Sequence, residues 1–182
     1  KLLEEVVSEA ESAYLDLSKR LDHEVHFRIP LVIYRTHAEF EQTNIALEEI
    51  DEAVGAFAEP TQNRMVVPID TPSDRRFTII RHELTHIFEF DILYAGSLRR
   101  ALRSAPPAWL MEGLASYLGD DEDSFDQMVI RDAVVSNEIP SLEELRYPVF
   151  LTYRFGHAIF DFIETTYGAQ GLRTFLFEFR KS

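Results

Sequence analysis

Apolar residues recur every three or four positions over most of the chain, which is the spacing of one face of an α-helix. In residues 1–22 the other face is rich in glutamate, so this segment is expected to form an amphipathic helix. The same pattern predicts helices over 74–93, 108–119, 124–136, 149–167 and 170–180. Gly168 is predicted to divide the last two, because glycine commonly ends a helix.

Strand-like patterns are confined to the first half of the chain. Residues 24–35 alternate apolar and polar before an apolar run, and Pro30 within them indicates a sheet edge or a bulge. Residues 53–59 and 64–69 are predicted to form two further strands around a short turn. Pro68 predicts that the second of these lies at an exposed edge, because proline has no N–H for the ladder.

A helix start follows the first strand directly. Thr36 with Glu39 three residues later has the pattern of a capping box, so a helix is predicted over 37–49. Strands therefore come early and helices late, which favours an α+β fold with a small sheet. No internal repeat or linker interrupts the sequence, and we expect one domain over 1–182.

Composition narrows the function classes. The 182 residues are 46% hydrophobic and 27% charged, which is ordinary for a globular protein, and no apolar run is long enough for membrane insertion. The absence of cysteine excludes disulfides, thiolate nucleophiles, iron–sulfur clusters and cysteine-ligated zinc. A net charge of −14 argues against nucleic acid and anionic membranes as partners, because both require a basic surface.

The ends of the sequence suggest a larger parent. Lys1 already lies within a helical pattern, and the chain stops abruptly at Ser182. We therefore expect this chain to be a piece of a longer protein, and the absence of a targeting segment is uninformative about localisation.

The string His82-Glu83-Leu84-Thr85-His86 has the spacing H-E-x-x-H within the 74–93 helix. Residues four apart share a helix face, so His82 and His86 can direct two imidazoles at one metal ion. Glu83 is rotated by about 100° from His82, where it can take a proton from bound water. The alternative is a structural helix with two satisfied histidines and a solvated glutamate.

The rest of that helix suits a metal site. Five apolar residues are predicted to form its core-facing side: Phe77, Ile80, Leu84, Ile87 and Phe88. Ile79 and Phe90 are expected beside the two histidines as an apolar wall, which strengthens the pull of an ion on bound water.

A catalytic zinc ion usually has a third protein ligand. Glu112 is the best candidate, since it lies in the apolar segment 109–115, followed by the small residues Gly113 and Ala115, which allow close helix packing. A buried acid there costs several kcal/mol unless it is paired or bound to metal. Glu89 is a weaker rival, because it lies one turn beyond His86 on the same helix and would have to fold back.

At these residues the sequence resembles the gluzincin metallopeptidases, most closely bacterial peptidase MA-like domains. Their pattern of H-E-x-x-H followed by W-x-x-E-G-x-A stands here at 82–86 and 109–115, and the stretch from Tyr153 to Gly168 resembles the end of such a domain. The likeness covers about residues 30–180, and 1–29 match no pattern we recognise. The two motifs are specific together and weak singly.

The resemblance implies a zincin-like fold, with a small N-terminal mixed sheet, an active-site helix and a mainly helical C-terminal part. It implies a hydrolase that cleaves peptide bonds, with one zinc ion per chain held by His82, His86 and Glu112 and with Glu83 as general base. Tyr153 fits the role of a second oxyanion donor best, with Tyr147 and His157 as alternatives. Members often belong to exported bacterial proteins, so an extracytoplasmic location and further domains of a parent chain are implied, beside a peptide or protein substrate.

Two other readings stay open at the level of sequence. A catalytically silent zincin-like domain would serve binding or assembly, although it has no need for Glu83, and a metal-free structural domain would bind no metal at all. We also expect the 64–69 strand to line the cleft and to bind extended peptides by strand addition. The acidic loop 120–123 is expected to be a solvated helix cap more than a calcium site, and the arginines at 99, 100 and 103 are expected to be a solvated or paired surface.

Overall fold

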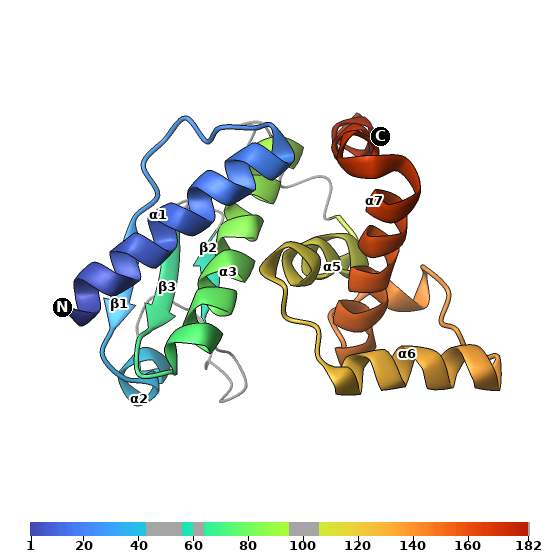
Figure 1. The fold of residues 1–182 in the computed structure, drawn as a ribbon, viewed down its shortest axis with the longest axis horizontal. Helices are drawn as coiled ribbons and strands as arrows, with labels where there is room; N and C mark the ends of the chain where they lie inside the picture. Colours follow the sequence, from blue (N-terminus) through green and yellow to red (C-terminus); the bar gives the residue numbers. More distant parts are fainter. Residues whose placement is uncertain (43–55, 60–63, 95–105, 182) are drawn as a thin grey trace. The chain divides into compact units, whose positions relative to one another are not determined.

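The computed structural model describes residues 1–42, 56–59, 64–94 and 106–181. The described chain is mainly helical with one small mixed sheet, so the coarse α+β prediction is confirmed (Figure 1). It divides into two compact units, Lys1–Phe90 and Asp91–Ser182. Among the described helices, none combines the length and the apolar character that a membrane crossing requires.

The helices follow the predicted pattern closely. The main ones are α1 (Leu2–Leu21), α3 (Ser73–Tyr94), α5 (Ala108–Gly119), α6 (Ser124–Ser136) and α7 (Phe150–Phe179). The predicted division at Gly168 is present as a break inside α7, where this glycine has φ 70° and ψ 176°. That conformation is accessible to glycine almost alone, which explains why the helical pattern changes there.

The acidic loop 120–123 caps the two helices that it joins. Asp120 has a left-handed conformation at the end of α5, and Asp123 begins α6 by accepting hydrogen bonds from the backbone N–H groups of Phe125 and Asp126. Asp126 in turn accepts from the backbone of Asp123, which completes a capping box. The helix-capping prediction is confirmed, and no metal-ligating group is found in this part of the described chain.

The sheet lies in the N-terminal unit and contains three short strands. They are β1 (Leu31–Tyr34), β2 (Phe57–Glu59) and β3 (Arg64–Pro68), in the order β1-β3-β2. β1 pairs with β3 in parallel, whereas β2 pairs with β3 antiparallel. The central strand is therefore β3, the last of the three in the sequence. Its residues from Met65 onward are buried.

The prediction that Pro68 lies at an exposed edge is wrong. Pro68 is buried at the end of the central strand, opposite Tyr34 of β1. Met65 and Ile69 donate their N–H groups toward β1, so alternate residues such as Pro68 face the side of β2. β2 pairs only as far as Val66, and the missing N–H of Pro68 therefore leaves no ladder partner unsatisfied.

Strand addition along 64–69 is also wrong as predicted. β1 lies along one side of β3 from Met65 to Pro68, and β2 occupies the other side from Arg64 to Val66. An incoming peptide backbone would find these hydrogen-bonding groups already used. Residues 64–68 form a strand as predicted, but the position of that strand in the sheet depends on partners that lie elsewhere in the chain.

The segment before α3 differs in extent from the prediction. Only Leu31–Tyr34 of residues 24–35 form a strand, although that strand is indeed at an edge of the sheet. Thr36 caps α2 (His37–Glu41) by accepting from the Glu39 N–H, while the Glu39 carboxylate accepts from Arg35. The remainder of the helix predicted over 37–49 lies largely outside the described residues.

In the N-terminal unit α1 packs along α3 (Figure 1). The Tyr14 and Phe88 rings have centroids 5.3 Å apart, and Arg76 of α3 makes two 2.8 Å contacts with the Glu9 carboxylate of α1. This hydrogen bonding raises the pKa of the Arg76 guanidinium above its ordinary value. A second ion pair joins Arg81 to Asp16 at 3.0 Å. The first helix thus supports the face of α3 that turns away from the two histidines.

In the C-terminal unit α5 and α7 cross at two glycines. A Cβ atom built on Gly113 would lie 2.5 Å from the Gly156 backbone, and one built on Gly156 would lie 2.6 Å from Gly113 Cα. Only glycine at both positions allows the two backbones to approach so closely. The crossing lies directly beside Glu112, so it fixes the place of that side chain within its unit.

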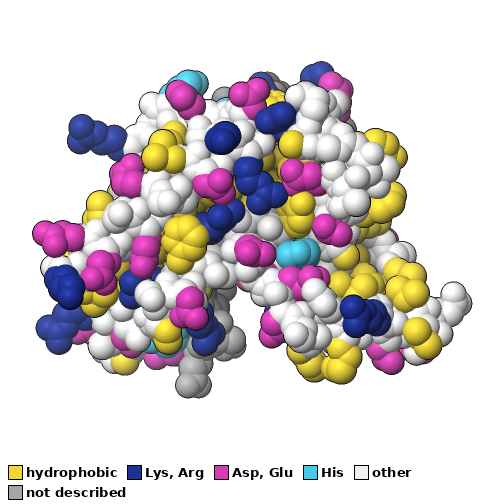
Figure 2. Space-filling view, viewed as in Figure 1, with side chains coloured by type: hydrophobic (Ala, Val, Ile, Leu, Met, Phe, Trp, Pro, Cys, Tyr) yellow, Lys and Arg dark blue, Asp and Glu magenta, His cyan; other side chains and the backbone are white. Residues whose placement is uncertain are grey.

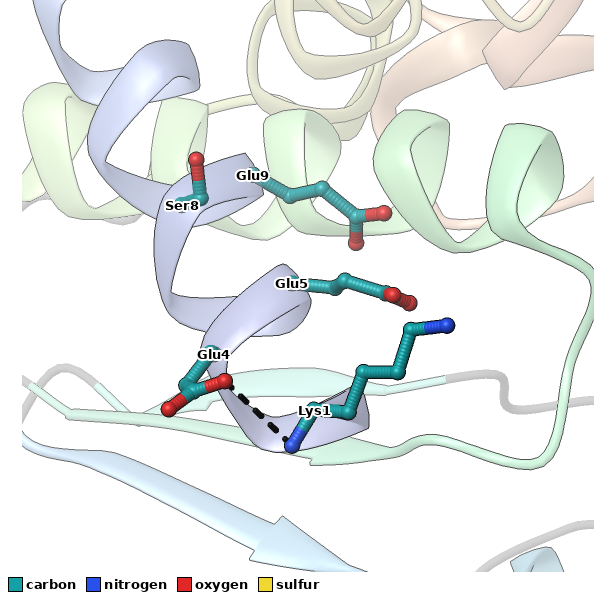
Figure 3. Close-up of a pocket in the computed structure, with 5 residues that line it drawn as sticks. All are labelled: Lys1, Glu4, Glu5, Ser8 and Glu9. Carbon is teal, nitrogen blue, oxygen red and sulfur yellow. Dashed lines mark ion pairs between the residues drawn. The ribbon is translucent and has the colours of Figure 1, made fainter.

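The surface combines both charges with scattered apolar side chains. On the face in Figure 2, acidic and basic groups alternate over both units, and hydrophobic side chains gather near α6. A shallow depression on the first turns of α1 is lined by Lys1, Glu4, Glu5, Ser8 and Glu9 (Figure 3). Glu9 is already bonded to Arg76, and the depression holds none of the predicted site residues.

The glycine crossing gives the first prediction. Gly113→Ala should destabilise the protein by roughly 1–3 kcal/mol, because the new methyl group meets backbone that cannot turn aside. Thermal unfolding followed by circular dichroism should show a midpoint lowered by several degrees. Thr165→Ala, at an exposed position of α7, should leave the midpoint nearly unchanged. Equal midpoints for both variants would contradict this account of the crossing.

Candidate metal centre

The two motif histidines lie one turn apart on α3. Their ring centroids are 5.0 Å apart and the ring planes are inclined at 80°, and both side chains are partly exposed. The predicted core-facing residues Ile80, Leu84, Ile87 and Phe88 are buried, whereas Phe77 is half-buried. Burial of this stripe fixes the rotation of α3 about its axis and so determines where the histidines point.

Glu83 is buried, with 7% of its surface exposed. An ionised carboxylate at such a position requires hydrogen bonds or a cation to offset its lost hydration. The hydroxyl of the neighbouring Thr85 is bonded to the Arg81 carbonyl of its own helix at 2.8 Å, so Thr85 has a structural role. Of the two polar residues between the histidines, Glu83 is therefore the one with an ionisable side chain.

Glu89 is a partner of His86. Its Oε2 lies 2.7 Å from His86 Nδ1, and only 1% of the Glu89 side chain is exposed. The ring of Phe90 stacks against His86 with a centroid distance of 6.2 Å and an interplanar angle of 16°. The predicted apolar wall is therefore present at Phe90. Glu89, predicted only as a weaker alternative metal ligand, instead contacts the His86 imidazole.

Glu112 completes a group that could hold a metal ion. It is half-buried on α5, after an N-terminus preceded by Pro107. The ligand atoms of His82, His86 and Glu112 all lie within 4.8 Å of one another, and no other such group of three is found among the described residues. The predicted ligand set is thus brought together.

The donor set fits a divalent transition metal. Two imidazole nitrogens and one carboxylate oxygen leave at least one coordination position for water or substrate. Zinc accepts this set, and so does ferrous iron, which means that the donors alone do not select the ion. These three residues could therefore hold a metal ion, and their chemistry does not identify that ion.

The three candidates for a second oxyanion donor differ in their surroundings. Tyr153 is half-buried in the first turn of α7, while the Tyr147 side chain lies before that helix and is 67% exposed. His157 is buried, and its Nδ1 lies 3.1 Å from Ser116 Oγ. The role assigned to Tyr153 stays a prediction.

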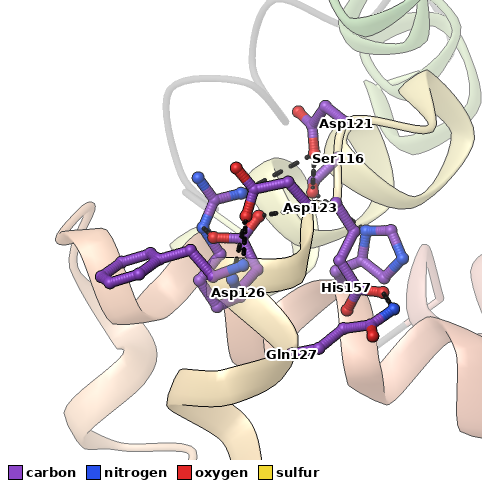
Figure 4. Close-up of polar contacts among 9 residues, drawn as sticks. Ser116, Asp121, Asp123, Asp126, Gln127 and His157 are labelled. Atoms are coloured by element: carbon purple, nitrogen blue, oxygen red, sulfur yellow. Dashed lines mark hydrogen bonds and ion pairs between the residues drawn. The ribbon is translucent and has the colours of Figure 1, made fainter.

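His157 belongs to a buried polar network in the C-terminal unit (Figure 4). Ser116 Oγ donates to Asp121, since a carboxylate only accepts, and it must therefore accept from His157 Nδ1–H. This order differs from that of a nucleophilic triad, in which histidine takes the serine proton. Arg154 joins the same network through its 3.9 Å ion pair with Asp121, and it also pairs with Asp126 at 2.6 Å.

The network therefore links α5, the acidic loop and α7. His157 and the acidic loop are recognisable separately in the sequence, but nothing in the spacing shows that Ser116 bridges them. The arginines at 99, 100 and 103 lie outside the described residues. The three histidines of the N-terminal segment are structural or on the surface: His23 packs against Phe88, His26 is exposed, and His37 pairs with Glu41.

Comparison with known proteins gives no family for this chain. No family model, no curated protein and no solved structure matches it. The case for the site therefore rests on the motif residues and on the geometry in which they lie.

The ligand group gives the second prediction. Glu112→Ala and His82→Ala should each weaken zinc binding by more than about 100-fold. Loss of a residue that only supports a ligand costs up to about 100-fold, and loss of a ligand itself should cost more. Competition with a coloured chelator measures this affinity. Glu178→Ala, which removes an exposed acid paired with Lys181, should bind zinc as the unaltered chain does. Unchanged affinity in Glu112→Ala would remove Glu112 from the ligand set.

Proposed function

We propose that this chain is a zinc-dependent metallopeptidase domain of the gluzincin type. The observation that carries the proposal is the convergence of His82, His86 and Glu112, with the ligand atoms within 4.8 Å, next to the buried Glu83. The residue types and their spacing are those of a metal site that retains an open position and a general base. The resemblance of the two motifs to peptidase MA-like domains supports the same reading.

His82, His86 and Glu112 would hold a zinc ion, which would supply polarisation of the scissile carbonyl and a lowering of the pKa of the attacking water toward about 7. Glu83 then has the role of general base: its carboxylate takes a proton from that water and passes it to the leaving amine. His82, His86 and Glu112 supply ligands and take no proton.

The main alternative is a silent zincin-like domain that binds metal and serves binding or assembly. The buried Glu83 argues against this alternative. A domain that only binds metal or partners needs no general base there, and burying an acid costs free energy. Elemental analysis of the purified chain separates both readings from a metal-free structural domain. Digestion of a broad peptide library then separates the enzyme from the silent domain.

The third prediction concerns the general base. Glu83→Gln keeps the size of the side chain and removes its basicity, so zinc should stay bound while peptide hydrolysis falls by at least about 10²–10⁴-fold. Turnover of a peptide cleaved by the unaltered chain is the measurement, with zinc content determined on the same sample. Glu143→Gln, at an exposed position far along the sequence, is the matched control. A Glu83→Gln protein with full activity would exclude the mechanism.

The fourth prediction concerns the second donor to the oxyanion. Tyr153→Phe removes one hydroxyl and keeps the ring, so turnover should fall by about 10²–10³-fold with little change in stability. Tyr147→Phe and His157→Ala are measured beside it. Near-normal turnover in Tyr153→Phe with collapse in one of the other two would transfer the role to that residue.

A further inference from the structure

The contact between Glu89 and His86 is unusual in being almost wholly removed from water. Glu89 has 1% of its side chain exposed, and His86 has 12%. The 2.7 Å separation of Oε2 and Nδ1 is typical of a strong, charge-assisted hydrogen bond. Burying a carboxylate costs several kcal/mol unless such bonds offset it, so the position of Glu89 calls for a specific role.

The hydrogen bond determines which nitrogen of His86 carries the proton. An ionised carboxylate has no proton to donate, so the proton between the two groups belongs to Nδ1. In a neutral imidazole the lone pair is then on Nε2, the nitrogen that remains available to a metal. The opposite tautomer would place two acceptors against each other across 2.7 Å.

The same contact also fixes the plane of the ring. Glu89 holds the Nδ1 edge of the imidazole, while the Phe90 ring lies parallel to its face at a centroid distance of 6.2 Å. All three residues belong to α3, and the spacing of three between His86 and Glu89 places them on neighbouring positions of one helix face. The orientation of His86 is therefore built into the helix itself.

We propose that Glu89 is a positioning residue of the metal centre, which holds His86 with its Nε2 lone pair directed to the ion. This inference rests on the proposed function, in which His86 is a metal ligand. Carboxylates that bond to a ligating histidine typically contribute 10–100-fold to metal affinity. Glu89 acts through His86 and is not itself a ligand, since its Oε2 is bonded to the imidazole.

The fifth prediction compares two substitutions of Glu89 in the 182-residue chain. Glu89→Ala should weaken zinc binding by about 10–100-fold in chelator competition, because His86 loses its fixed tautomer and orientation. Glu89→Gln should recover most of this loss, since its amide oxygen can still accept from Nδ1–H. Asp126→Asn is the matched control: it alters another buried, ion-paired acid and should leave zinc affinity unchanged.

A second measurement reads the tautomer directly and does not depend on activity. Long-range ¹H–¹⁵N spectra of the metal-free, unaltered chain should show His86 protonated at Nδ1, and Glu89→Gln should keep that signature. An Nε2-protonated His86 in the unaltered chain would overturn the inference even if Glu89→Ala failed to fold.

The outcomes separate this inference from the proposed function. If the unaltered chain binds no zinc, the metal centre fails and the role of Glu89 fails with it. If the unaltered chain binds zinc and Glu89→Ala binds it equally well, only the role of Glu89 is excluded. A loss in Glu89→Ala that Glu89→Gln restores, with Asp126→Asn unchanged, supports the positioning role.

Discussion

The site depends first on the burial of one stripe of α3. Ile80, Ile87 and Phe88 are removed from water, and a helix that buries this stripe can adopt only one rotation about its axis. His82 and His86 then share the opposite face. The ion pair of Arg76 with Glu9 adds a directional contact to α1, so α1 supports the helix that carries the two histidines of the candidate metal group.

A second constraint acts on the helix that carries Glu112. Gly113 and Gly156 allow α5 and α7 to touch backbone to backbone, and any side chain at either position would force them apart. The bridge from Ser116 to His157 joins the same two helices one turn further on. The close backbone contact at the glycines and this buried hydrogen bond thus fix the position of the helix that carries Glu112 within the C-terminal unit.

Buried carboxylates are the most informative feature of α3. Glu83 and Glu89 are each less than one-tenth exposed, although hydration strongly favours leaving such groups at the surface. The protein keeps one beside the two histidines and the other in contact with His86 Nδ1. The proposed roles, general base for Glu83 and positioning residue for Glu89, would explain why both acids are buried.

The sequence by itself predicted the main helices and the pairing of His82 with His86, because periodicity and H-E-x-x-H spacing are local properties of the chain. It also proposed Glu112 as the third member of the group that could hold a metal ion. The start of α2 at Thr36 and the cap at Asp123 were equally local. The tertiary structure alone decided that β3 is the central strand, which excluded strand addition beside Pro68. It also decided that Ser116 bridges Asp121 and His157. Strand order and side-chain hydrogen bonds depend on which residues far apart in the sequence come into contact. Hydrophobic periodicity carries no information about those contacts.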